Sequence, residues 1–185
     1  LASGILLYGM SLLYGLTGSL SLAELASASG ELAPTNLPLL TAVVLIVAGL
    51  LFKLGVVPFH MWVPDVYDGS ATSTTLLLSS VPKLAAFAIM LRLLAYGLGE
   101  WTSAWQDMLA IAAVLSISVG NIVAIAQTSI KRMLGYSTIS HMGFLLLGFL
   151  GGTTHGYSAS LSYVVIYTVI TLGAFGIILL LSKPQ

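Results

Sequence analysis

The amino-acid sequence predicts an all-α polytopic membrane protein, a transmembrane helix bundle of about six spans that includes one discontinuous helix. Two observations lead to this class. Hydrophobic residues make up 58% of the 185 positions and charged residues only 6%, whereas soluble domains carry about 25% charged residues. Apolar runs of roughly 20 residues also recur, and that length is needed to cross the hydrocarbon core of a bilayer. An ordinary water-soluble fold is therefore excluded.

The first two spans are placed by the apolar run at the start of the chain and by the run that follows its first loop. Residues 1–18 form the first run, and the loop after it contains Pro34. The second span covers 39–67 and is broken near Pro58, because proline lacks the amide hydrogen that a continuous helix needs. Its backbone at the break must lie beside protein or a cavity, since lipid offers no hydrogen bonds.

Apolar runs place the other four spans at 72–96, 108–128, 136–152 and 159–182. Trp101 and Trp105 precede the fourth span, where tryptophan commonly anchors a helix at the membrane interface. Within that span Ser116 and Gly120 form a small-xxx-small pair, which favours close helix packing. The fifth span is rich in glycine, and we expect it to pack closely against another helix as well. The sixth span carries a polar stripe that would hydrogen-bond to another helix: Tyr163, Tyr167 and Thr171.

Charge and composition narrow the functional classes. The net charge is zero, so no basic surface points to nucleic acid. Cysteine is absent, which removes disulfides and thiolate-held metals from this chain. No phosphate-binding loop, dinucleotide-binding glycine motif or HExxH zinc motif occurs. We therefore expect no cofactor, no metal and no redox or hydrolytic chemistry in this chain alone.

The basic residues of the loops give the orientation. Alternating the six spans across a membrane places Lys131, Arg132 and Lys183 on one side, which the positive-inside rule assigns to the cytoplasm. Asp65 and Asp68 fall on the same side and fit the rule poorly.

Lys83 is the most informative single residue. It lies near the middle of the third span, about 16–20 Å from either end at 1.5 Å per residue. An extended lysine side chain reaches only about 6 Å, so Lys83 cannot bring its charge to either membrane surface. Contact with lipid would be costly, and we expect the amine to face other helices or a hydrated cavity.

A stripe of hydroxyls accompanies this lysine. Thr75, Ser79 and Lys83 are spaced four residues apart and share one helix face, with Ser80 beside them. The hydroxyls could hold water that reaches the amine, and burial disfavours the charged form of a lysine, which would allow Lys83 to exchange protons. The alternative is a buried lysine held by a fixed partner for packing alone.

Three further residues are candidates for proton transfer. Lys53 lies near mid-membrane if the second span resumes after its break, and reaches the surface if the span ends at Val57 instead. His60 follows the break, and His141 lies within the fifth span. Histidine exchanges protons near neutral pH, so both are candidates for a relay. An interhelical hydrogen bond is the alternative role for each.

Two long motifs resemble a known family. The segments GLLFKLGVVPFHMWVPDVYDG (49–69) and GNIVAIAQTSIKRMLGYSTISHMGFLLLG (120–148) are similar to the antiporter-like membrane subunits of respiratory complex I. The similarity is strongest to the N-type group of NADH-quinone oxidoreductase subunits, to which mitochondrial subunit 2 and the chloroplast B-type subunit correspond. It covers nearly the whole chain.

This resemblance implies a proton-translocating membrane subunit. The family fold has about fourteen helices in two inverted repeats, each with a discontinuous helix, and residues 1–185 would be a partial transmembrane domain covering helices six to eleven. Lys53 and Lys83 match two family lysines of a mid-membrane chain of charged residues that carries protons, and His60 matches a recurrent histidine beside them. The proton-transfer residues would then be Lys53, Lys83, His60 and His141.

The resemblance also implies partners. The chain would be a non-redox subunit of an NADH:quinone oxidoreductase, in contact with lipid and with neighbouring antiporter-like and small subunits. NAD, FMN, iron–sulfur clusters and quinone would belong to partner subunits. A bacterial inner membrane is the expected location, with the mitochondrial inner and thylakoid membranes as alternatives.

Part of the family pattern has no counterpart here. A glutamate of helix five would precede Leu1, and a lysine of helix twelve would follow Gln185, so we expect this chain to be a piece of a longer subunit. Two other functions stay open. A cation/proton antiporter subunit shares the fold, although a sodium site would need mid-membrane carboxylates. A purely structural arm that spaces other subunits is the second alternative.

Overall fold

The computed structural model describes residues 2–31 and 36–182, and in that part of the chain all regular structure is helical. The helices are α1 (Ala2–Thr17), α2 (Leu22–Gly30), α3 (Leu37–Leu54), α4 (Trp62–Gly69), α5 (Thr72–Met90), α6 (Thr102–Ile125), α7 (Ile130–Leu150) and α8 (Thr154–Leu181). A π-helix (Leu91–Gly97) continues α5, and a 3-10 turn (Gly99–Trp101) leads into α6. The predicted all-α class is confirmed.

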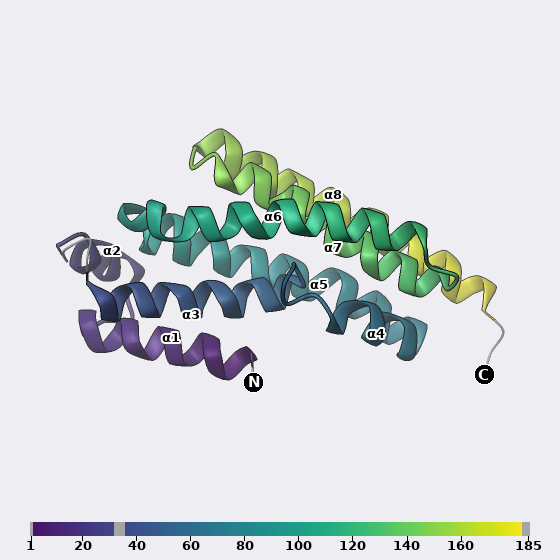
Figure 1. The fold of residues 1–185 in the computed structure, drawn as a ribbon, viewed down its shortest axis with the longest axis horizontal. Helices are drawn as coiled ribbons and strands as arrows, with labels where there is room; N and C mark the ends of the chain where they lie inside the picture. Colours follow the sequence, from purple (N-terminus) through teal and green to yellow (C-terminus); the bar gives the residue numbers. More distant parts are fainter. Residues whose placement is uncertain (1, 32–35, 183–185) are drawn as a thin grey trace.

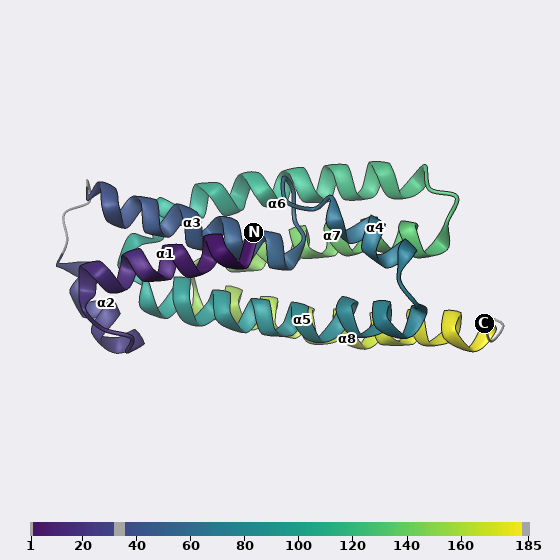
Figure 2. The same ribbon diagram turned by 90° about the horizontal axis from the view of Figure 1, so that it is seen from below.

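The long helices run side by side along one axis and form an elongated bundle (Figure 1). α1 packs on α3, α6 on α7, and α5 on α8. The turned view shows α5 and α8 lying together along one side of the bundle (Figure 2). Within residues 2–31 and 36–182, five helices are long and apolar enough to cross a membrane, and α1 with α2, bent by 66°, makes a sixth if the pair is one span. The prediction of about six spans agrees with this.

Local sequence signals explain where several helices begin. The Asn36 side chain accepts a hydrogen bond from the Leu39 amide at the start of α3, over 3.0 Å. Ser129 and Thr153 cap α7 and α8 in the same way. Such side chains satisfy amide groups that the first turn of a helix leaves without partners.

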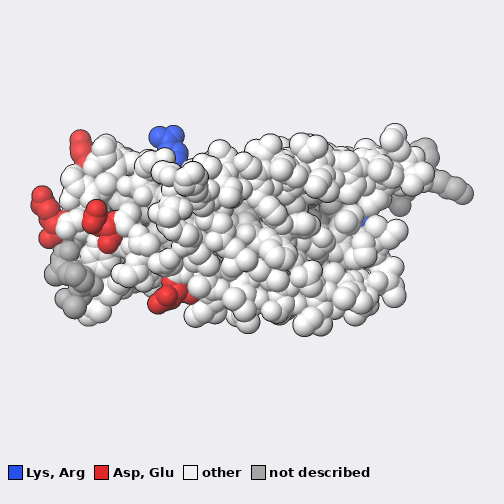
Figure 3. Space-filling view, turned by 90° about the horizontal axis from the view of Figure 1, so that it is seen from above, with Lys and Arg blue, Asp and Glu red and all other residues white. Residues whose placement is uncertain are grey.

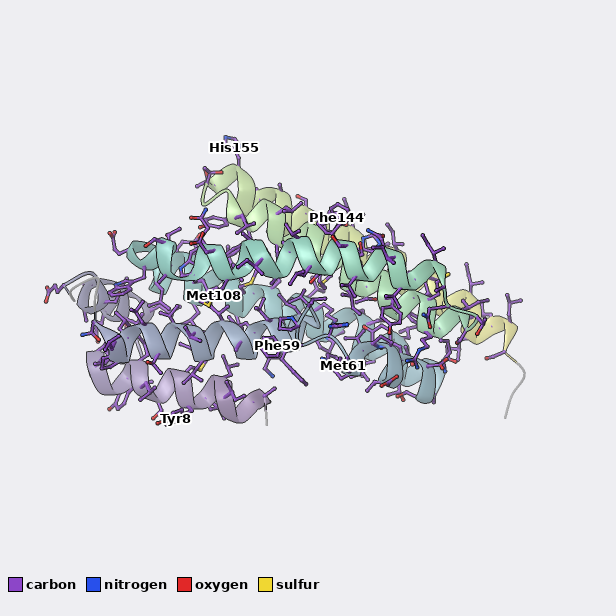
Figure 4. The ribbon with its side chains drawn as sticks, in the orientation of Figure 1. Tyr8, Phe59, Met61, Met108, Phe144 and His155 are labelled. Atoms are coloured by element: carbon purple, nitrogen blue, oxygen red, sulfur yellow. The ribbon has the colours of Figure 1, made fainter. Side chains whose placement is uncertain are left out.

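The predicted discontinuous helix is confirmed. α3 ends at Leu54, an irregular segment covers 55–61, and α4 begins at Trp62. The break lies close to the middle of the long axis, and Phe59 and Met61 project from it (Figure 4). The two halves, α3 and α4, pack against α1, α5, α6 and α7. The backbone at the break can therefore find hydrogen bonds within the protein.

The structure differs from the sequence prediction at three places. The stretch after the first span contains α2, which is short and rich in serine and alanine and so lacks a long apolar pattern. α6 begins at Thr102 rather than near 108. α7 begins at Ile130 rather than at 136, which places the basic residues of the predicted loop in its first turn.

The prediction that two tryptophans anchor the fourth span at the interface is wrong. Trp101 is 7% exposed and Trp105 is fully buried. Their indole N–H groups donate to the carbonyl oxygens of Ser29 and Leu98, at 3.0 and 3.2 Å. Trp105 also packs against Phe149, with ring centroids 5.5 Å apart. Both indoles therefore fix α6 to neighbouring segments of the protein.

The surface suits a lipid environment. Large apolar side chains are exposed along the outer helices, among them Ile122, Ile125 and Leu180. A space-filling view shows a broad uncharged surface, with acidic side chains gathered toward the end that carries α2 (Figure 3). Lys183, one of the three residues that give the predicted orientation, lies outside the described residues, and the orientation stays a prediction.

Candidate functional site

The Lys83 side chain ends at the break in the α3–α4 helix. Lys83 is fully buried, and its ammonium nitrogen donates to the carbonyl oxygens of Leu54 at 2.7 Å and Lys53 at 3.3 Å. These are the last two residues of α3. The expectation that Lys83 faces the protein interior rather than lipid is confirmed.

The break explains why a lysine is needed at this depth. The last four carbonyl groups of any helix lack partners within the helix. At the end of α3, the carbonyl of Leu51 accepts from the amides of Gly55 and Val56, and that of Phe52 from Gly55. The two carbonyls that remain are the two that bind the lysine. A cation also complements the partial negative charge at a helix C-terminus, by up to about 2 kcal/mol in a partly buried setting.

Gly55 makes the approach of the lysine possible. Its φ of +75° is a left-handed conformation that L-residues with a side chain rarely adopt. A Cβ at this position would collide with Val63 and come within 3.2 Å of the Lys83 nitrogen. Glycine therefore ends α3 and also leaves the space that the ammonium uses.

The amide of Val57 is satisfied from another helix. It donates to Ser116 Oγ on α6 at 2.9 Å, and the Ser116 hydroxyl donates in turn to the Ala112 carbonyl at 2.6 Å. Ser116 was predicted to serve close helix packing, and its contact with the break shows a second, more specific use. Gly120, its predicted companion, does lie against α7, where a Cβ would come within 2.7 Å of the Ser140 backbone.

Trp62 completes the surroundings of the lysine. Its indole N–H donates to the Phe52 carbonyl at 3.0 Å, and its ring stacks on the Phe52 ring at 5.7 Å. The Lys83 nitrogen lies 4.9 Å from the Trp62 ring centroid. The sequence analysis missed this residue, although a tryptophan directly after a proline-broken segment that also contains a lysine was a usable signal.

The hydroxyl stripe on α5 is present, but it does not bind the ammonium. Thr75, Ser79 and Ser80 are buried. Thr75 donates to the Tyr67 carbonyl at 3.2 Å, and the two serines donate to the Leu76 carbonyl. Within the described residues none of them bonds to the lysine nitrogen. The direct partners of the ammonium are the carbonyls at the end of α3, because a broken helix offers acceptors that need a donor. That the hydroxyls hold water leading to the amine stays a prediction.

Lys53 and His60 belong to the same break, Lys53 in the last turn of α3 and His60 in the irregular segment that follows. Lys53 contributes a backbone carbonyl to Lys83 and is itself half-buried. In the part of the chain that the structure describes, its side chain makes no hydrogen bond or ion pair. The Nδ1 atom of His60 is buried and, within the same residues, has no hydrogen-bond partner. Both groups therefore have unused hydrogen-bonding capacity.

His141 belongs to a second polar cluster, between α7 and α8. Its Nδ1 atom is hydrogen-bonded to the Tyr163 hydroxyl at 2.7 Å, and its ring lies 5.4 Å from that of Tyr167. The Tyr167 hydroxyl donates to Thr138 Oγ1 at 2.9 Å. The polar stripe predicted for the sixth span thus meets the histidine predicted for the fifth.

A cavity of about 60 Å³ adjoins this second cluster. Its polar lining residues are Ser137, Thr138, His141, Tyr167 and Thr171. A water molecule needs roughly 10–15 Å³ of such volume and two to four polar partners. The cavity is therefore large enough and polar enough for water. No direct contact joins it to the Lys83 site among the described interactions.

Charged residues tie α4 to α7 at one end of the bundle. Arg132 forms an ion pair with Asp65 at 2.8 Å, and Ser129 donates to Asp68 at 2.5 Å. The Lys131 ammonium donates to the Ser70 carbonyl at 2.7 Å. These contacts explain why acidic residues lie on the predicted basic side, since each aspartate has a partner on α7.

The described residues contain no cluster of three His, Cys, Asp or Glu side chains that could hold a metal ion. His155, the third histidine, lies at the start of α8, across the bundle from Phe59 of the break (Figure 4).

Comparisons with known proteins show which sequences and solved structures the chain resembles. A family model described as NADH:quinone oxidoreductase/Mrp antiporter, TM, matches residues 1–185. The NADH-quinone oxidoreductase subunit N of Thiobacillus denitrificans is 58% identical over 183 residues, which cover 99% of this chain and 38% of the relative. The subunit N of Methylovorus glucosotrophus is 59% identical, with the same coverage. The chain therefore spans 38% of the length of these relatives.

Solved structures show the same fold. A chain of respiratory complex I from Thermus thermophilus is 37% identical, with a TM-score of 0.77 over 96% of this chain and 37% of that one. A chain of an archaeal membrane-bound sulfane sulfur reductase is 29% identical, with a TM-score of 0.84 over 95% and 36%. A chain of the Mrp complex from Dietzia is 24% identical, with a TM-score of 0.84 over 94% and 32%, which shows likeness of fold alone.

Proposed function

The chain belongs to the NADH:quinone oxidoreductase/Mrp antiporter family of transmembrane proteins, and on this premise we propose that it is part of a proton-translocating subunit of an NADH-quinone oxidoreductase. Relatives that are more than half identical carry the name of subunit N of that enzyme. The membrane character follows from the apolar helices and from the family.

The observation that carries the proposal is the buried ammonium of Lys83 at the broken helix. A proton carrier must be stable with and without its proton. The two carbonyls of α3 favour the charged form, while complete burial favours the neutral form. A balance of this kind lets a change of charge nearby move the proton on or off the lysine.

The four predicted residues have separate roles in this proposal. Protons reach Lys53 along hydrated paths and pass to Lys83 across the break, where His60 has a free ring nitrogen to assist. His141 acts as a relay beside the water-sized cavity between α7 and α8. The link between the two clusters is formed by water or by segments of the longer subunit.

The complete enzyme supplies the driving force elsewhere. In this proposal the chain is a non-redox membrane subunit, and NAD, FMN, iron–sulfur clusters and quinone are held by partner subunits. Neighbouring membrane subunits of the complex are its protein partners. Bacterial relatives favour the bacterial inner membrane as its location.

An antiporter of the same fold is the second candidate, because the description of the matching family model also names the Mrp antiporter. A sodium site would need carboxylates near mid-membrane. None of the acidic residues that the structure describes is buried. Asp65, in the first turn of α4, is 68% exposed and paired with Arg132. The proton-translocating reading therefore has the stronger support.

Alanine variants of the complete complex test the proposal. Lys53→Ala and Lys83→Ala, each in the full-length subunit, are reconstituted in proteoliposomes, and protons translocated per NADH oxidised are measured. We expect the intact complex that forms to lose translocation in both lysine variants, while His155→Ala, at an exposed tip, retains it. Full translocation in both lysine variants would support a structural arm, and sodium-dependent exchange would support the antiporter.

A further inference from the structure

Trp62 contacts both sides of the broken helix. It is the first residue of α4, yet its indole N–H donates back to the Phe52 carbonyl on α3 at 3.0 Å. Its ring also stacks on the Phe52 ring, at an interplanar angle of 20°. An indole has a single donor and no acceptor, so this bond and the stacking together fix the direction in which the ring face points.

The fixed ring face lies against Lys83. The ammonium nitrogen is 4.9 Å from the ring centroid, within the roughly 6 Å over which a cation is attracted to an aromatic face. The same nitrogen binds the Leu54 carbonyl at 2.7 Å. The ammonium is thus held between the end of one half-helix and the first side chain of the other.

The ring attracts only the charged form of the lysine and not its neutral form. The electrostatic attraction to an aromatic face requires a positive charge, and it is strongest when water is excluded. Lys83 is fully buried, so water screens the contact little. A neutral amine would keep its hydrogen bonds to the carbonyls but would lose the attraction to the ring.

We propose that Trp62 is a positioning residue for proton transfer, which holds the charged form of Lys83 at the break through its ring face. This inference rests on the proposed function, because it assigns Trp62 a role through Lys83. Trp62 itself exchanges no proton. Its hydrogen bond to Phe52 aims the ring, and the ring determines how firmly the ammonium stays at the end of α3.

Fluorinated tryptophans test this role without changing the shape of the site. Fluorine withdraws electron density from the ring face, and a series of mono-, di- and tetrafluoroindoles at position 62 weakens the attraction stepwise while the N–H donor remains. In the complete complex in proteoliposomes, we expect protons translocated per NADH to fall steadily along the series. We expect a decrease of about twofold or more for the tetrafluoro ring, consistent with loss of a desolvated cation–π contact.

Trp101 provides a matched control. Its indole N–H donates to a backbone carbonyl, Ser29, over the same 3.0 Å, and no cation lies over its ring among the described residues. The same fluorinated series at position 101 should leave translocation unchanged. Trp62→Phe, which keeps an aromatic face, should retain more translocation than Trp62→Leu, which has none.

The outcomes separate this inference from the proposed function. If Lys83→Ala abolishes translocation but every fluorinated Trp62 translocates at the wild-type ratio, Trp62 serves packing alone and the inference is overturned. If Lys83→Ala translocates normally, the proposed function itself fails. If Trp62→Leu does not assemble, the fluorinated series still decides the question, because the fluorinated rings keep the N–H and nearly the size of tryptophan.

Discussion

The ammonium nitrogen of Lys83 lies 2.7 Å from the carbonyl oxygen of Leu54, a residue 29 positions earlier that ends α3. The contact joins two features that are costly in a membrane, an amine far from water and a helix end with unpaired carbonyls. The ammonium donates hydrogen bonds to the carbonyls, so both groups gain the partner that lipid would not provide. The break in the helix is therefore part of the lysine site, and substitutions at the break should affect the lysine.

Gly55→Ala should destabilise this site. The substitution places a side chain at a φ of +75°, which costs about 1–2 kcal/mol, and its Cβ would collide with Val63 and crowd the Lys83 nitrogen. We expect a lower thermal midpoint of the purified complex and reduced proton translocation. Gly4→Ala is the control, since nothing lies within 4 Å of a Cβ there. Equal midpoints for the two variants would show that the space beside Gly55 is not needed.

Ser116→Ala should loosen the break without touching Lys83. It removes the acceptor of the buried Val57 amide, and a buried donor left without a partner costs about 1–3 kcal/mol. Hydrogen exchange measured by mass spectrometry should become faster in peptides that cover 55–61. Ser118→Ala, which loses only an exposed bond within the same helix, should leave that exchange unchanged. Unaltered exchange in Ser116→Ala would mean that another group satisfies the amide.

The ion pair between Arg132 and Asp65 should contribute little to stability. The two side chains are 37% and 68% exposed, and solvent screens the attraction in such pairs. Asp65→Asn should therefore shift the thermal midpoint only slightly, and less at high salt. A double-mutant cycle with Arg132→Gln measures the coupling. A large coupling energy would contradict this expectation and show that the contact between α4 and α7 is buried in the assembled complex.

Tyr163→Phe should slow proton transfer at His141. The change removes the hydroxyl that binds the Nδ1 atom, and loss of one hydrogen bond of about 1 kcal/mol corresponds to roughly a fivefold change in rate. The rate of NADH-driven proton uptake into proteoliposomes is the measurement. Tyr157→Phe is a matched control, because Tyr157 packs on Phe149 through its ring. Equal rates in both variants would remove His141 from the proposed route.

Much of the fold could be predicted from the sequence because the membrane simplifies the pattern. Long apolar runs correspond to helices, and Pro58 predicts the break in the discontinuous helix. The errors occurred where the pattern is weak. α2 is too short and too polar to be recognised, and Trp105 was read as an interface residue because nothing in its local sequence shows that α6 begins at Thr102.

The burial of Lys83 could be predicted from the sequence, but its hydrogen-bond partners could not. The distance of Lys83 from either end of its span showed that it must be buried, and the structure agrees. Its partners could not be inferred, because they are backbone carbonyls, and every residue has one. The carbonyls of Lys53 and Leu54 lack helical partners only because the backbone turns at Gly55 and ends α3. The position of that turn is seen only in the folded structure.

The most direct test of the account compares Lys83→Arg with Lys83→Met in the complete complex. Arginine keeps the positive charge at all relevant pH values and can still bind the carbonyls of α3, but it does not release a proton. Methionine has neither charge nor donor. The measurement is protons translocated per NADH oxidised, with assembly judged by the amount of intact complex. The account predicts better assembly for Lys83→Arg than for Lys83→Met, with translocation lost in both. Translocation at the wild-type ratio in Lys83→Arg would contradict it, because a group that never gives up its proton cannot be the carrier.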